Sequence, residues 1–72
     1  MNYQSLLKTT KNQAENIAFI CGKNYRCKAG YRQPALDTCC QWLWSTFPEL
    51  KEQITNNWLK GWEQQNKIIL HK

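Results

Sequence analysis

Four basic residues and two tyrosines lie within ten consecutive residues of this 72-residue chain, with no acidic residue among them. The basic residues are Lys23, Arg26, Lys28 and Arg32, and the tyrosines are Tyr25 and Tyr31. Cationic side chains bind phosphates, and neighbouring aromatic rings stack on unpaired bases. The stretch therefore predicts a site for nucleic acid or another anion. The alternative is a solvated polar loop whose tyrosines pack against the domain.

The net charge of +5 is concentrated in the same half of the chain. Residues 1–34 contain six basic residues and one acidic residue, whereas residues 35–72 contain four of each. Such a polarised positive field attracts phosphate polymers, acidic proteins or anionic membranes.

The tryptophans offer a second kind of contact. Trp58 and Trp62 are four residues apart, so they share one helix face and bracket Gly61. They are either core side chains or a flat platform for a protein partner or for RNA bases. Core is the better interpretation for at least one of them. Trp42 points away from the apolar arc of its helix, so we expect it to be an exposed anchor for a partner.

The four cysteines do not have the spacing of a metal site. Structural zinc uses ligand pairs separated by two to four residues, unlike Cys21, Cys27, Cys39 and Cys40. We therefore expect no metal and no cofactor. Disulfides are possible if the chain is exported, but no secretory signal supports export, so the default expectation is buried thiols at Cys21, Cys39 and Cys40. Cys27 would be the exposed, reactive thiol beside two cations.

Catalysis has little support in the sequence. The one histidine, His71, lies next to the C-terminus, where helices fray. Nucleophile elbows, phosphate-binding loops and paired carboxylates are absent from the sequence. The interpretation is that the protein is not an enzyme.

Helices must position these residues, because valine is absent and β-branched residues are scarce. Thr10 and Gln13 have the form of a capping box. Apolar residues at spacings of three and four follow until Gly22, a natural C-terminal stop, although this first helix could begin near Ser5. Residues 22–34 would then form the basic loop.

Two more helices are expected. The second begins at Pro34 and ends before Pro48, with an apolar arc of Leu36, Cys39, Cys40, Leu43, Trp44 and Phe47. The third follows a second capping box, formed by Thr46 and Glu49. Its core face would consist of Leu50, Ile54, Trp58, Trp62, Ile68 and Ile69. Gly61 either ends this helix or lies within a continuous helix, where it lets another backbone or a ligand approach closely. We favour the continuous helix.

The fold prediction is a single all-α domain over residues 1–72, a small three-helix bundle with a basic loop between helices one and two. Residues 1–9 could be frayed. No apolar run approaches the ~18 residues of a membrane span, and the first residues do not resemble a secretory signal. We therefore expect a cytoplasmic protein without membrane contact. Because the core is small, a homodimer could complete it.

The segment Trp58-Leu59-Lys60-Gly61-Trp62 resembles the Trp-Leu-x-Gly-Trp segment of ribosome modulation factor and related small basic proteins. Ala29-Gly30-Tyr31 is similar to the Ala-Gly element of that family. The family's Cys-Pro-Tyr is missing, and residues 39–47 add a helix-length insertion. The resemblance implies a small helical protein that binds the ribosome and silences translation under stress.

Two functions follow as hypotheses. The first is a small basic regulator that binds RNA or a ribonucleoprotein such as the ribosome through the basic stretch. The second is a protein-binding inhibitor or adaptor of the kind carried by phages and plasmids, which would use the exposed tryptophans and the basic loop against an acidic or nucleic-acid-binding partner.

Overall fold

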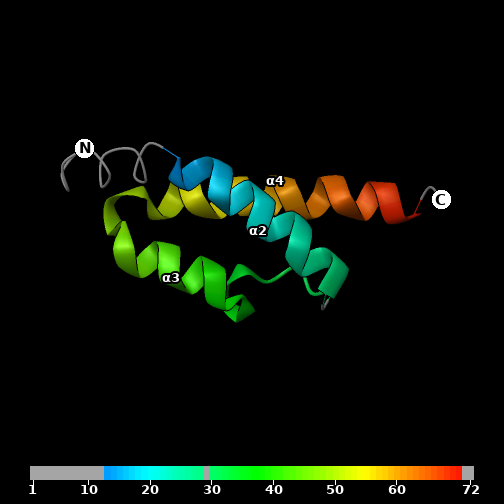
Figure 1. The fold of residues 1–72 in the computed structure, drawn as a ribbon, viewed down its shortest axis with the longest axis horizontal. Helices are drawn as coiled ribbons and strands as arrows, with labels where there is room; N and C mark the ends of the chain where they lie inside the picture. Colours follow the sequence, from blue (N-terminus) through cyan, green and yellow to red (C-terminus); the bar gives the residue numbers. More distant parts are fainter. Residues whose placement is uncertain (1–12, 29, 71–72) are drawn as a thin grey trace, which may run out of the picture.

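The computed structural model describes residues 13–28 and 30–70. This part of the chain forms α2 (Ala14–Lys28), a 3-10 turn η1 (Pro34–Leu36), α3 (Thr38–Thr46), a second 3-10 turn η2 (Pro48–Leu50) and α4 (Lys51–Leu70), with no strand among the described residues. The all-α class is therefore confirmed, and the described residues contain three α-helices. Figure 1 shows α2 and α4 running in the same direction, while α3 runs back in the opposite direction along one side of this pair.

Helix α2 continues through the segment for which the sequence predicted a loop. Ile17 N–H donates to the carbonyl of Gln13 at 2.9 Å, and the helix extends to Lys28 instead of stopping at Gly22. The left-handed glycine that follows the helix is Gly30, with φ of 84°, and its N–H donates to the carbonyl of Tyr25. The predicted C-terminal stop at Gly22 is therefore wrong. The predicted cap at Thr10, the start near Ser5 and the frayed residues 1–9 lie outside the described residues.

Gly22 lies inside the helix because another backbone crosses there. A Cβ atom on Gly22 would lie 2.0 Å from the carbonyl oxygen of Trp58, and one on Gly61 would lie 2.0 Å from the carbonyl oxygen of Phe19. The absence of a side chain at each glycine therefore lets the backbone of the other helix approach closely. Ala14 and Ala18 precede Gly22 at intervals of four and are fully buried. One face of α2 therefore carries only small side chains. The continuous helix predicted at Gly61 is confirmed.

Helix α3 begins later than the sequence predicted. Pro34 starts the turn η1 and not the α-helix, and Asp37 occupies the N-cap position, where its Oδ1 accepts from Cys39 N–H at 3.1 Å. Helix α3 ends at Thr46, before Pro48, as expected. The second predicted capping box is wrong, because Thr46 is the last residue of α3 and Phe47 stands before η2 without a side-chain cap.

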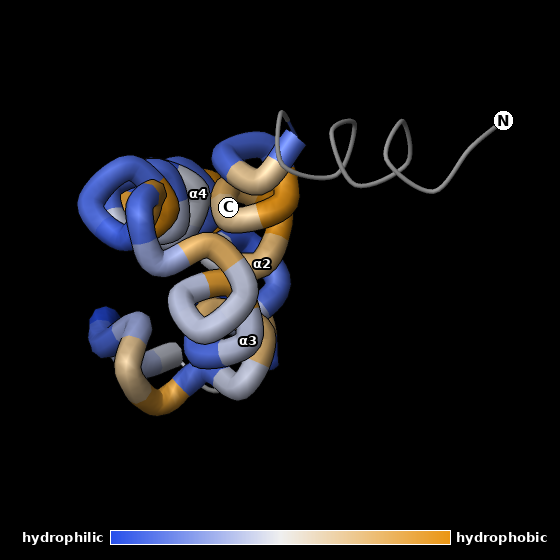
Figure 2. Tube along the Cα trace, turned by 90° about the vertical axis from the view of Figure 1, so that its left-hand side faces the viewer, coloured by the Kyte–Doolittle hydropathy of each residue, from blue (hydrophilic) through white to orange (hydrophobic). Residues whose placement is uncertain are grey.

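The core lies where the three helices meet. Its buried apolar members come from all three helices and the α3–η2 junction, and they are Ala14, Ala18, Cys40, Leu43, Phe47, Ile54, Trp58 and Trp62. Figure 2 views the helices end-on, with hydrophilic turns of α4 directed outward. Two residues that the sequence analysis placed on core faces lie outside the core: Leu36 is 52% exposed and Ile68 is 47% exposed. Leu36 belongs to η1, so the helical arc predicted for it does not apply.

Candidate functional site

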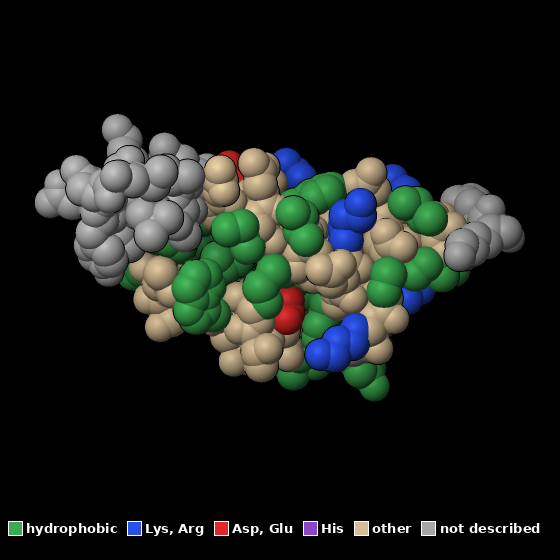
Figure 3. All heavy atoms as spheres, viewed as in Figure 1, with side chains coloured by type: hydrophobic (Ala, Val, Ile, Leu, Met, Phe, Trp, Pro, Cys, Tyr) green, Lys and Arg blue, Asp and Glu red, His purple; other side chains and the backbone are tan. Residues whose placement is uncertain are grey.

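The basic stretch is not a loop and does not form one patch. Lys23, Tyr25, Arg26 and Lys28 lie on α2, and only Tyr31 and Arg32 lie in the connection to η1. Because successive helical residues are turned by about 100°, the cations of α2 point in different directions. In the view of Figure 3 the blue side chains stand apart from one another among hydrophobic and neutral ones. The structure therefore corrects the prediction of one cationic connector.

Arg26 is engaged in the packing of α2 against α4. Its Nε donates to Oδ1 of Asn66 at 2.7 Å, and its guanidinium carbon lies 5.6 Å from the centre of the Trp62 ring. The guanidinium stacks readily on an aromatic face, so this cation covers the core. Lys23 is also directed to a ring, with its amine 5.8 Å from the centre of Phe19.

Arg32 reaches across to α4. Its Nε donates to Oε1 of Glu63 at 2.7 Å, and both side chains are about half exposed. An exposed pair of this kind contributes at most about 1 kcal/mol to stability. The ion pair has a larger effect on the local charge, because Arg32 neutralises Glu63 on this side of α4.

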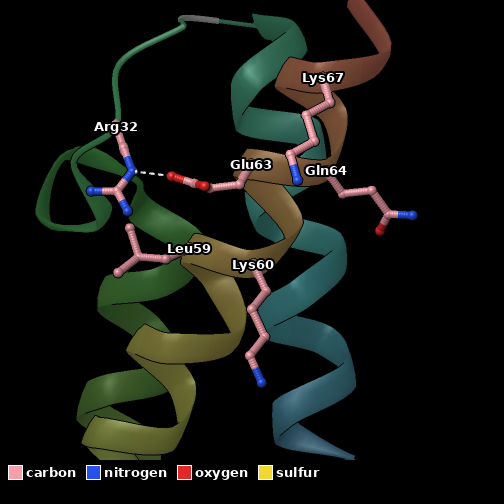
Figure 4. A pocket seen from close by; sticks show the side chains of 6 residues that line it. All are labelled: Arg32, Leu59, Lys60, Glu63, Gln64 and Lys67. Carbon is pink, nitrogen blue, oxygen red and sulfur yellow. Dashed lines mark hydrogen bonds and ion pairs between the residues drawn. The ribbon is translucent and has the colours of Figure 1, made fainter.

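This ion pair borders an open hollow of about 400 Å³ on the outer side of α4. Its lining residues are Arg32, Leu59, Lys60, Glu63, Gln64 and Lys67. In Figure 4 Arg32 approaches from the connection, while Lys60 and Lys67 extend from the same side of α4. We call these six residues the α4 basic face. Sequence reasoning missed Lys60 and Lys67 because the second half of the chain has no net charge; their spacing of seven, two helical turns, was the available signal.

The two tyrosines of the basic stretch have different environments. Tyr31 is 62% exposed, beside Arg32 in the chain, so its ring is free to stack on a base. Tyr25 packs against the core, with its ring centre 5.6 Å from that of Trp58. The predicted stacking role therefore fits Tyr31, and Tyr25 follows the alternative of a packed tyrosine.

The tryptophans divide between core and surface. Trp58 is fully buried and Trp62 is 9% exposed, so the core alternative holds for both and neither presents a platform to a partner. Trp42 is 53% exposed, in agreement with the expectation of an exposed anchor. It contacts Phe47 edge-on, with the ring centres 6.5 Å apart.

The sequence predicted only free thiols, and the structure differs at two of the four cysteines. Cys21 of α2 and Cys39 of α3 form a disulfide, with Cα atoms 6.5 Å apart. Cys40 is a buried thiol, as predicted, and burial together with the nearby Asp37 carboxylate raises its pKa to about 12. Cys27 is exposed, as predicted. Within residues 13–28 and 30–70 no group of three or more potential ligand residues is placed to hold a metal ion.

Comparison of the chain with protein-family models, with curated proteins and with solved structures finds no match. None of the helices in the described part of the chain has the length and apolar character needed to cross a membrane.

Proposed function

We propose that this small three-helix bundle is a non-enzymatic regulator that binds RNA, or RNA within a ribonucleoprotein, through the α4 basic face. One observation carries the proposal: Lys60 and Lys67 extend from the same side of α4, and the acidic residue between them is already paired with Arg32. The face therefore keeps two unneutralised ammonium groups beside a guanidinium. Lysine and arginine in this arrangement attract phosphate oxygens.

The spacing of these cations suits a polymer. Lys60 and Lys67 are seven residues apart in α4, which corresponds to about 10 Å along the helix axis. Two cations at this separation reach two different phosphates of a strand better than a single phosphate. Tyr31, exposed beside Arg32, supplies a ring on which an unpaired base stacks. Single-stranded or looped RNA is therefore the form that we favour.

The resemblance to ribosome modulation factor is consistent with this proposal. Within Trp58-Leu59-Lys60-Gly61-Trp62, the two tryptophans and Gly61 are buried, whereas Leu59 and Lys60 line the hollow. In this chain the segment would thus hold the helices together on one side and contact RNA on the other. A ribosomal target and a cytoplasmic location remain part of the proposal.

Fluorescence anisotropy with a labelled single-stranded RNA at several salt concentrations tests the proposal. Replacing both lysines (Lys60→Gln with Lys67→Gln) should weaken binding and reduce the slope of log K against log salt by about 1.4, since each single-strand phosphate contact contributes about 0.7. Lys51→Gln is the control, because its amine lies over the Trp44 ring, 5.0 Å from its centre, and does not line the hollow. A salt-independent affinity, or equal slopes for the wild type and the double variant, would refute RNA binding by this face.

A second candidate function is supported by Trp42. A tryptophan that is 53% exposed and rests edge-on against Phe47 resembles the aromatic anchors of protein interfaces. Under this alternative the protein is an inhibitor or adaptor that binds another protein. Affinity capture should then recover the same protein after nuclease treatment, and Trp42→Ala should abolish its recovery. Loss of all partners on nuclease treatment would favour RNA binding instead.

A further inference from the structure

A second hollow, of about 500 Å³, lies between α2 and the start of α3. Its lining residues are Cys21, Asn24, Tyr25, Lys28, Leu36, Asp37, Thr38 and Cys39. It shares no residue with the α4 basic face. Its volume is in the range of small-molecule sites, and both sulfur-bearing residues of the disulfide belong to its wall.

The hollow contains a cation near this disulfide. Cys21, Asn24 and Lys28 are three and four residues apart, so they follow one face of α2. Lys28 is exposed, and among the described residues it has no ion pair. Asp37 also lines the hollow, but its carboxylate is 8% exposed and accepts hydrogen bonds from Cys39 N–H and the Trp58 indole, so the exposed charge belongs to Lys28. An anionic ligand in this hollow would therefore meet an unneutralised ammonium group.

The two sulfurs of the disulfide differ in their position relative to Lys28. Cys39 is the second residue of α3, and Cys21 lies in the middle of α2. A ligand held by the ammonium group of Lys28 therefore lies along the helix that carries Cys21. Attack at Cys21, with Cys39 as the leaving group, is the favoured direction.

We propose that this hollow binds an anionic low-molecular-weight thiol, which exchanges with the disulfide to give a mixed disulfide at Cys21. The thiolate of the ligand attacks Sγ of Cys21 and forms the new S–S bond. The Cys21–Cys39 bond breaks, its electron pair departs with Sγ of Cys39, and this sulfur takes a proton from water. One disulfide replaces another, so no further oxidant or reductant is needed.

Apart from Cys39, the thiols of the described residues are poorly placed to reverse the step. Cys40 is adjacent to Cys39, but its thiol is buried and its pKa is raised to about 12, so it carries almost no thiolate near neutral pH. Cys27 does not line the hollow. The exchange therefore leaves α2 and α3 without their covalent link until the Cys39 thiolate displaces the ligand. The protein would respond to the concentration of small thiols around it.

Glutathione, which carries two carboxylates, is the probe, and cysteamine, a cationic thiol, is the comparison. Each is incubated with the oxidised full-length protein, and intact mass and non-reducing peptide mapping follow adduct formation. After correction for the thiolate concentration, glutathione should react about two- to fivefold faster than cysteamine, as for an exposed ion pair. The adduct should map to Cys21.

Two variants test the role of the cation. Lys28→Gln should remove the preference for glutathione, Lys28→Glu should reverse it, and Lys51→Gln, a control outside the hollow, should preserve it. The proposal is overturned if the native protein lacks the Cys21–Cys39 disulfide, if the adduct forms only at Cys27 or Cys39, or if Lys28→Gln retains the wild-type preference. These results do not depend on RNA binding, which is proposed to use Lys60 and Lys67 and not Lys28.

Discussion

Asp37 and Trp58 are 21 residues apart in the chain and are joined by a buried hydrogen bond of 2.7 Å, in which the indole Nε1 donates to Oδ2 of the carboxylate. The other carboxylate oxygen accepts from Cys39 N–H at the start of α3. One side chain therefore caps α3 and attaches it to the middle of α4. This connection determines where α3 begins relative to the core.

Replacing Asp37 by alanine should destabilise the protein by about 2–4 kcal/mol. Loss of an N-cap costs about 1 kcal/mol, and a buried indole N–H without an acceptor costs about 1–3 kcal/mol more. Urea unfolding followed by tryptophan fluorescence measures the change. Asp37→Asn should cost less, because its amide oxygen still accepts one bond. Glu15→Ala, in the exposed first turn of α2, is the control; a similar small change in both alanine variants would contradict the assigned role.

Gly22→Ala and Gly61→Ala should each destabilise the fold, although alanine is the better helix former by about 1 kcal/mol. A Cβ at either position would lie 2.0 Å from a backbone oxygen of the facing helix, so α2 and α4 must separate. The expected net loss is about 1–3 kcal/mol or more, visible as a lower Tm. Gln53→Ala, on the exposed side of α4, should change stability by less than about 0.5 kcal/mol. A stabilised glycine variant would disprove the close crossing.

Glu63→Gln should strengthen RNA binding. The substitution releases Arg32 from its ion pair at 2.7 Å and removes the negative charge from the α4 basic face. One more cation becomes available to phosphate, so the salt slope should steepen by about 0.7. Glu52→Gln changes the net charge equally but lies in the first turn of α4, outside the hollow. If both variants bind RNA with the same affinity and slope, net charge alone acts and the face has no special role.

The Cys40 thiol should make the fold sensitive to alkaline pH. Its pKa is raised from 9.0 to about 12 by burial and by Asp37, so above pH 9 the folded state holds a proton that the unfolded state releases. The stabilising contribution is complete below pH 9 and is lost between pH 9 and about 12, at up to about 1.4 kcal/mol per pH unit. Thermal unfolding at several alkaline pH values should show a steeper decline for the wild type than for Cys40→Ala. Parallel declines would contradict the raised pKa.

The helical class could be read from the sequence, but the role of Gly22 could not. A glycine within a helical pattern serves either as a C-terminal stop or as a point of close approach. The choice at Gly22 depends on Gly61, which lies on a helix 39 positions later in the chain. At Gly61 the continued phase of Ile68 and Ile69 indicated a continuous helix, and the structure confirms it. The sequence alone was therefore enough to predict the helix where the apolar periodicity continued on both sides of the glycine.

The candidate site was less predictable because a charge count does not show which charges the fold itself uses. Arg26 and Arg32 belonged to the predicted cluster, yet Asn66, Trp62 and Glu63 engage them through contacts more than 30 residues apart. Because residues 35–72 have no net charge, the charge count did not point to Lys60 and Lys67 on the outer face of α4. Trp42 was placed correctly because its exposure follows from one helix alone.

The contacts of Arg26 and Arg32 separate two kinds of positive charge in this molecule. Both arginines are held by side chains of α4, while Lys60 and Lys67 extend from its outer side into an open hollow. Acetylation of lysine, which removes the charge and leaves arginine untouched, would therefore discharge the surface without loosening the helices. If the proposed RNA binding uses this face, acetylation would weaken that binding while the protein stays folded.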